Sequence, residues 1–179
     1  MSRRLFAGCL FVGCLMVAAL AATLVLANGA FPKVANEAVL LECSDCHLAY
    51  QPQMLPQRSW RKLMEGLADH FGEELSLVDE TRDEVLGYLL DNAADSGKSK
   101  KGRKFMKGIG SDDAPIRITE TPRWRKKHHE LPDRVWSDPR VEFKGRCEVC
   151  HTKAERGGYD DDDVRVPGPN GSWRAWDDD

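Results

Sequence analysis

Cys43-Ser44-Asp45-Cys46-His47 and Cys147-Glu148-Val149-Cys150-His151 share one pattern, C-x-x-C-H. This pattern is the attachment signature of c-type haem. Two thiols three residues apart lie on one side of a helical turn, where they can form thioethers with the two vinyl groups of one porphyrin. The histidine that follows then offers its imidazole to the iron as proximal ligand. The sequence therefore predicts two covalently bound c-type haems, attached through Cys43, Cys46, Cys147 and Cys150, with His47 and His151 as iron ligands.

A zinc site or a pair of disulfides would use the same cysteines. Zinc ribbons place two C-x-x-C pairs about 15–20 residues apart, whereas 100 residues lie between Cys46 and Cys147. A disulfide needs no histidine beside it, yet one follows each pair directly. Haem attachment accounts for both observations, and the two alternatives account for neither.

The first 29 residues have the pattern of a secretory signal peptide. Arg3 and Arg4 form a positively charged start, residues 5–26 carry no charge, and small residues precede a cleavage site after Gly29. An uncleaved membrane anchor is the alternative, because the uncharged run exceeds the roughly 18 residues that suffice to span a bilayer. We therefore expect a periplasmic protein that is soluble after cleavage, or a membrane-anchored form if the signal is retained.

Cleavage would also leave a simple cysteine inventory. Of the six cysteines, Cys9 and Cys14 lie in the signal, and the other four all belong to the two motifs. Free thiols are unusual in an oxidising compartment, so this inventory agrees with thioethers. Losing Arg3 and Arg4 would leave 24 basic against 29 acidic residues, a net charge of about −5 with neutral histidines. Export and this acidic balance argue against nucleic acid as a partner.

Basic residues are nevertheless concentrated in two runs. Such runs are most often solvated surface, but they can also form a docking surface for a charged redox partner. The first run comprises Lys98, Lys100, Lys101, Arg103, Lys104 and Lys107, and the second comprises Arg123, Arg125, Lys126 and Lys127.

The mature chain is predicted to be mainly α-helical and to hold two different haem domains. Each domain is too small to bury much core unaided, and a covalent haem would supply a large apolar body for it. No repeat relates the two halves. The predicted parts are a signal peptide (1–29), an N-terminal c-type haem domain (30–95), a basic linker (96–115), a C-terminal c-type haem domain (116–167) and an acidic, Trp-containing tail (168–179).

Hydrophobic periodicity and capping residues predict the helices. In the N-terminal domain they cover 35–47 and 58–71, and a third opens near Ser76 with Val85, Leu86, Leu89 and Leu90 as its buried stripe. In the C-terminal domain Thr121 is the expected N-cap, with Pro122 at the first helical position and an end near Leu131. Residues 164–179 are predicted to be irregular.

The remaining histidines are the candidates for the sixth ligands of the irons. His70 follows Trp60, Leu63 and Leu67 at helical steps, which places it on an apolar face where a haem would lie. His128 shares a helix face with Trp124, whereas His129 is rotated from it by about 100°. We therefore prefer His70 and His128, and His129 stays the alternative to His128.

Methionine is a second kind of ligand that the sequence offers. Met54 lies in a Pro-flanked loop and Met64 shares the broad apolar face of the His70 helix. Either thioether would raise the reduction potential of the first haem. Core packing is the alternative role for both residues.

The chain resembles the soluble dihaem cytochrome c family of purple photosynthetic and related bacteria. The resemblance rests on both C-x-x-C-H motifs and their order, on Glu42, and on the stretches 60–64, 69–72, 117–122, 127–128 and 161–167. It implies an N-terminal domain of the class I cytochrome c type followed by a distinct, partly irregular C-terminal haem domain. It also implies bis-histidine irons with His70 and His128 as distal ligands. The residues from Gly168 to Asp179 match nothing in the family.

The family implies an electron carrier rather than an enzyme. Its redox partner is a small oxygen-binding haem protein, often alongside a membrane b-type cytochrome, and no small-molecule substrate is expected. If both irons hold two imidazoles, no coordination site is open and the reduction potentials are low. The alternatives are a dihaem peroxidase or a haem-based ligand-binding protein, each of which needs one open haem.

Overall fold

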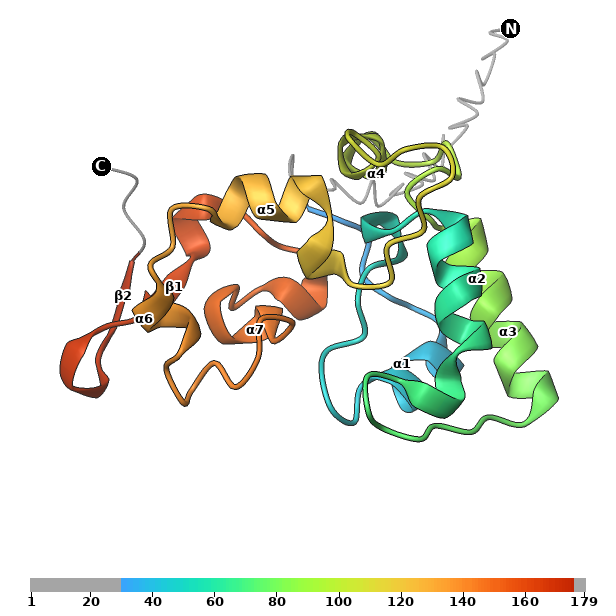
Figure 1. Ribbon diagram of the computed structural model, residues 1–179, viewed down its shortest axis with the longest axis horizontal. Helices are drawn as coiled ribbons and strands as arrows, with labels where there is room; N and C mark the ends of the chain where they lie inside the picture. The colour runs from blue at the N-terminus through green and yellow to red at the C-terminus, as the bar shows by residue number, and fades with distance from the viewer. Residues whose placement is uncertain (1–29, 176–179) are drawn as a thin grey trace, which may run out of the picture.

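The computed structural model describes residues 30–175 and is mainly helical, as predicted (Figure 1). The predicted signal peptide and residues 176–179 of the predicted tail lie outside the described residues. Between residues 30 and 175, no helix combines the length and the apolar character that a bilayer span requires.

Three helices surround the core of the N-terminal half: α1 (Glu37–Cys43), α2 (Gln57–Glu65) and α3 (Asp79–Asp91). The last two lie side by side, and α1 crosses below them in Figure 1. Val85 and Leu89 point from α3 into this core, where they meet Trp60 of α2. The Trp60 indole nitrogen donates to the carbonyl of Pro52 at 2.9 Å, so the buried ring leaves no polar group unpaired.

The helix ends differ from the sequence expectations. The helix expected over 58–71 ends at Glu65, because Gly66 follows and the chain continues as a 3₁₀ turn, Leu67–Asp69. The third helix begins at Asp79 rather than near Ser76 and has no side-chain cap. Of the four residues predicted to be buried on this helix, Val85 and Leu89 are buried, whereas Leu86 and Leu90 are partly exposed. The first helix is shorter than expected, and Asn36 caps it by accepting from the Val39 amide at 2.8 Å.

The predicted basic linker contains a helix, α4 (Lys100–Phe105), which its composition concealed. Ser99 caps this helix by accepting from the Gly102 amide at 3.1 Å. Gly102 is buried because it packs against the backbone of Ala94, where a Cβ would lie 2.7 Å from the carbonyl oxygen. The Phe105 ring meets the edge of the Phe31 ring at 5.7 Å. The segment is therefore packed on the N-terminal core.

The C-terminal half is built from short elements. It contains α5 (Pro122–His128), α6 (Asp133–Trp136) and α7 (Cys147–Cys150), and two strands, β1 (Arg165–Pro167) and β2 (Trp173–Ala175). The expected N-cap is confirmed, since Thr121 Oγ1 accepts from the Trp124 amide at 3.3 Å and Pro122 is the first helical residue. The helix ends at His128, three residues before the expected end. Short 3₁₀ turns occur in both halves: Pro52–Met54 lies between α1 and α2, and Ile118–Glu120, Ala154–Arg156, Asp161–Asp163 and Pro169–Gly171 follow α4.

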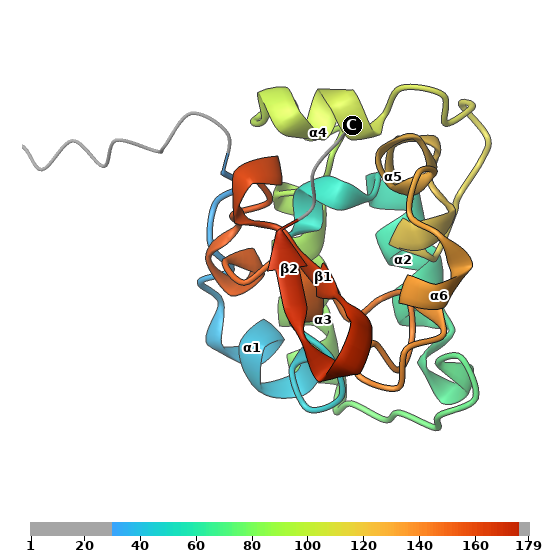
Figure 2. The ribbon, with the colours of Figure 1, turned by 90° about the vertical axis from the view of Figure 1, so that its left-hand side faces the viewer.

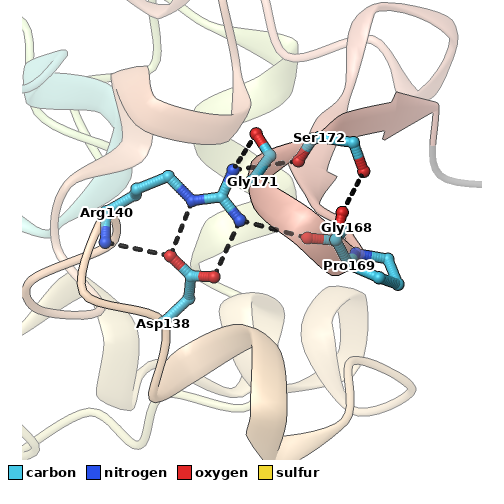
Figure 3. Close-up of polar contacts among 6 residues, drawn as sticks. All are labelled: Asp138, Arg140, Gly168, Pro169, Gly171 and Ser172. Atoms are coloured by element: carbon cyan, nitrogen blue, oxygen red, sulfur yellow. Dashed lines mark hydrogen bonds and ion pairs between the residues drawn. The ribbon is translucent and has the colours of Figure 1, made fainter.

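The segment expected to be irregular forms an antiparallel hairpin, so that expectation is wrong for residues 165–175. Arg140 holds the turn of this hairpin (Figure 3). Its guanidinium donates to the carbonyls of Gly171 and Ser172 at 2.9 Å, and Asp138 accepts from it at 2.8 Å through both carboxylate oxygens. The same guanidinium lies over the Trp173 ring, 4.9 Å from its centre. One arginine thus orders a turn that has little apolar surface of its own.

The two halves are joined through buried and partly buried contacts. The Gln51 amide nitrogen donates to the carbonyl of Ala154 at 2.8 Å, and its oxygen accepts from the Tyr159 hydroxyl at 2.6 Å. Phe31 donates its amide to the carbonyl of Gly157 at 2.8 Å. Gly157 has φ of 79°, and a Cβ there would overlap the Phe31 carbonyl oxygen, so glycine is required on both counts. The halves therefore pack as one unit.

Candidate functional site

The first C-x-x-C-H motif begins inside a helix and continues outside it. Cys43 is the last residue of α1, and residues 44–47 form bends, so only the first thiol lies on a helical turn. The Nδ1 atom of His47 lies 2.8 Å from the carbonyl of Leu48. Because a carbonyl can only accept, Nδ1 carries the proton and Nε2 keeps its lone pair. This is the arrangement of a metal-binding histidine whose second nitrogen is held by the protein.

His70 reaches the first motif from a tight turn rather than from the expected helix face. His70 and Glu73 exchange backbone hydrogen bonds of 2.8 and 3.3 Å. The two residues between them both have positive φ, 60° at Phe71 and 102° at Gly72, which is the mark of a two-residue hairpin turn. The His70 ring centre lies 6.3 Å from that of His47. Burial, with the charges of His47 and Arg117, lowers the pKa of His70, which favours the neutral, metal-binding imidazole.

The second motif forms a single helical turn, as expected. The helix α7 holds both Cys147 and Cys150, and the His151 amide donates back to the Cys147 carbonyl at 2.8 Å. The Nδ1 atom of His151 is buried and has no hydrogen-bond partner among the described residues. Burial, with the charge of His128, lowers the pKa of His151 to about 4, so its ring is neutral at pH 7. His151 therefore differs from His47, whose Nδ1 is held by a backbone carbonyl.

His128 faces the second motif, and its neighbour does not. The ring centres of His128 and His151 lie 6.1 Å apart. His128 Nδ1 lies 2.8 Å from the Trp124 carbonyl, which leaves Nε2 as the electron-pair donor, and its ring stacks on Trp124 at 4.3 Å and 13°. Burial lowers the pKa of His128. His129 is 65% exposed and directs Nε2 toward the Glu130 carboxylate at 3.4 Å.

Both histidine pairs have the spacing that one metal ion between them requires. Metal–imidazole bonds are about 2.0–2.1 Å long, and the centre of an imidazole lies about 1.1 Å from its nitrogen, so two rings that bind one ion from opposite sides have centres about 6.2–6.4 Å apart. The two observed separations are 6.3 and 6.1 Å. Each pair therefore has a spacing at which its two imidazoles could hold one iron.

A cavity of about 370 Å³ opens beside the second pair. Trp124, Trp136 and Leu131 supply apolar walls, and seven lysine and arginine side chains line it as well. Apolar walls with a cationic rim suit a porphyrin, which is an apolar disc that carries carboxylates. At the first pair, the Phe71 ring lies 4.8 Å from that of His70 and exposes apolar surface of the kind that a porphyrin would cover.

Burial makes three of the four thiols poor candidates for metal ligation. Burial raises the pKa of Cys147 to about 12 and that of Cys150 to about 11, and burial with the nearby Glu42 raises the pKa of Cys43 to about 11. The protonated thiol is a poor metal ligand. All four cysteines between residues 30 and 175 are free of disulfides, and in this range no group of three or more His, Cys, Asp and Glu side chains could hold a metal ion.

The two methionines lie in the core. Met54 and Met64 are 3% and 5% exposed and belong to the same apolar cluster as Trp60. Met54 also borders the cavity beside His128 and His151. Their burial agrees with the packing role that the sequence left open.

Residues 39–159 match the family model for dihaem cytochrome c. The chain belongs to the dihaem cytochrome c family. As a member of this family it carries two covalently bound c-type haems, the number that its two C-x-x-C-H motifs predict. This dihaem cytochrome is similar to the diheme cytochrome c from Rhodobacter sphaeroides, with 39% identity and a TM-score of 0.66 over 72% of this chain and all of that chain.

A second solved relative is the diheme cytochrome type c from Shewanella baltica. It is 32% identical and has a TM-score of 0.60 over 74% of this chain and 94% of that chain. No curated protein matches the dihaem cytochrome.

Sequence reasoning missed the side chains that lie between the two haem motifs. Tyr50 stacks on His47 with ring centres 4.5 Å apart and 16° between the planes, and its hydroxyl donates to the carbonyl of Gly145 at 2.9 Å. Tyr159, which holds Gln51, lies 5.2 Å from His151. No local pattern marks these residues, because their partners lie about 100 positions away. The two tyrosines connect the histidine of each motif to the other half of the molecule.

Proposed function

We propose that this dihaem cytochrome is an electron carrier in which each iron is held by two imidazoles, His47 with His70 and His151 with His128. The observation that carries the proposal is the ring separation of 6.3 and 6.1 Å in the two pairs. When bound, each haem supplies an iron that alternates between the ferric and ferrous states.

The side chains of this chain have three tasks in that function. Carbonyl groups orient His47 and His128 so that Nε2 is free to bind. Burial of His128 and His151 beside aromatic rings keeps water away from the iron site and favours neutral imidazole. Two imidazoles with no methionine favour a low reduction potential, and they leave no coordination position for a substrate. Electron transfer, rather than peroxide chemistry, is the role that this ligand set supports.

The proposed location is the periplasm, which follows from the signal-like pattern of residues 1–29 and from c-type haem attachment. The proposed partners are other redox proteins. A small haem protein is the partner that the family resemblance suggests, and a membrane b-type cytochrome is a further one. The predicted N-terminal and C-terminal haem domains would each contribute one iron to the route.

Single replacements of the distal histidines test the ligand assignment. His70→Ala and His128→Ala should each open one iron, so about half of the ferrous haem should bind carbon monoxide, whereas the unchanged protein binds none. His129→Ala is the matched control, because it removes an exposed neighbouring imidazole and should leave the optical spectrum unchanged. Carbon monoxide titration of the reduced proteins, followed in the Soret band, measures all three.

Two outcomes would contradict the proposal. If His129→Ala opens a haem and His128→Ala does not, the distal ligand of the second iron is wrong. If the unchanged protein already has high-spin haem that shifts on adding peroxide, the protein is a peroxidase rather than a carrier.

A further inference from the structure

The two basic runs of the sequence form one surface. The helices α4 and α5 contact each other and lie along the same edge of the molecule, at the top of Figures 1 and 2. No acidic residue interrupts either run. Among residues 30–175, Lys127 is the one cation of these runs that forms an ion pair, with Asp161 at 2.9 Å. We call this surface the α4–α5 face; its cations are Lys98, Lys100, Lys101, Arg103, Lys104, Lys107, Arg123, Arg125, Lys126 and Lys127.

The α4–α5 face borders the cavity of the second haem site. Five of its cations line that cavity: Lys101, Lys104, Arg123, Lys126 and Lys127. Burial and the charges of Lys104 and Arg123 lower the pKa of Lys101, and the charge of Asp160 partly offsets this decrease. These cations are therefore close enough to affect one another. Some of these side chains can pair with the carboxylates of the haem itself. The exposed Arg103 and Arg125 do not line the cavity, so they remain available to a partner.

The opposite edge of the molecule has the opposite charge. The turn that carries His70 and the start of α3 include seven acidic residues and one basic residue between positions 69 and 84. Glu42 and Asp45 add to this charge beside the first motif. An acidic protein would therefore be attracted to the second haem site and repelled from the first, although the chain as a whole is acidic.

We propose that the α4–α5 face docks an acidic redox protein and that the second haem exchanges electrons with it. The inference rests on the proposed electron-carrier function and adds the docking surface and the charge of the partner. In the step, one electron leaves the reduced centre of one protein and reduces the oxidised centre of the other, and no bond forms or breaks. Charge complementarity of this kind raises association rates by about 10- to 1,000-fold at low ionic strength.

The test uses a plant-type [2Fe–2S] ferredoxin, a small acidic electron donor, as the probe. Reduced ferredoxin is mixed with the oxidised holoprotein, and haem reduction is followed at several salt concentrations. Arg103→Glu with Arg125→Glu should lower the second-order rate constant at least tenfold at low salt. The matched control, Arg61→Glu with Lys62→Glu, makes the same charge change at exposed positions of α2 and should stay within about twofold. The difference should vanish near 1 M salt, where the screening length is about 3 Å.

Equal effects of the two double variants, or a rate constant that rises with salt, would overturn the docking proposal. A second result would also overturn it. If the unchanged protein binds anionic lipid vesicles, and the Arg103 and Arg125 variant loses that binding but keeps its ferredoxin kinetics, the α4–α5 face serves a membrane. Dithionite reduction and the optical spectrum of every variant are recorded alongside. A variant that keeps the low-spin spectrum but reacts more slowly with ferredoxin has lost docking only. A variant with an altered spectrum has lost the haem ligation on which the carrier function depends.

Discussion

Gln51 makes two of the hydrogen bonds that join the two halves. It is fully buried, and both ends of its amide bond across the interface, to Ala154 at 2.8 Å and Tyr159 at 2.6 Å. Gln51→Met keeps the length of the side chain and removes both hydrogen bonds. Each hydrogen bond contributes a net stabilisation of about 0.5–1.5 kcal/mol, and the Tyr159 hydroxyl is left without its acceptor. We therefore expect the free energy of unfolding to fall by about 1–3 kcal/mol.

That loss can be read as a change in melting temperature. For a chain of this size 1 kcal/mol corresponds to roughly 2–4 °C, so Gln51→Met should melt about 2–12 °C below the unchanged protein. Far-ultraviolet circular dichroism of the oxidised holoprotein measures it. Gln53→Met is the matched control, because Gln53 is buried two positions away and its Oε1 meets no donor among the described residues. A Gln51→Met protein that melts no lower than the Gln53→Met protein would refute the reasoning.

Three further substitutions probe the parts that position the two sites. Gly157→Ala should destabilise by more than about 1 kcal/mol in chemical denaturation, because φ is positive there and the new Cβ overlaps the Phe31 carbonyl; a neutral effect would contradict the close approach. Thr121→Ala should cost about 1 kcal/mol in the same assay by removing the N-cap of α5, and an unchanged unfolding midpoint would show that the cap is not needed. Arg140→Ala should speed amide exchange in residues 168–175. In the unchanged protein the hydrogen bond from Arg140 lowers the pKa of Asp138 to about 2. The protection of these amides from exchange should therefore hold above about pH 4 and fall as the pH drops toward 2. Protection that does not change with pH would exclude the Arg140–Asp138 pair as its cause.

The cofactor could be predicted from the sequence because haem attachment is a local property. Five consecutive residues, Cys147 to His151, contain the whole attachment site, and one helical turn presents it. The cap at Thr121 and the exposed position of His129 also followed from local rules. His128 was preferred for its helix face, and its ring does face His151.

The features that could not be predicted depend on contacts distant in the sequence. His70 was placed on a helix face, yet it lies in a hairpin turn after Gly66 ended the helix. The helix α4 is rich in lysine and forms against Ala94 and Phe31, neither of which its own composition reveals. The C-terminal hairpin exists because Arg140, about 30 residues earlier, holds its turn. In each case tertiary packing decided what local propensity left undetermined.

Near-infrared magnetic circular dichroism of the oxidised protein tests the ligation of both irons most directly. It distinguishes ferric haem with two imidazoles from haem with imidazole and thioether and from high-spin haem. We predict that both irons give the bis-imidazole signal in equal amounts and together account for all the bound haem. A thioether signal, which would bring back Met54 or Met64, or a high-spin fraction amounting to one of the two haems, would contradict the assignment of His70 and His128.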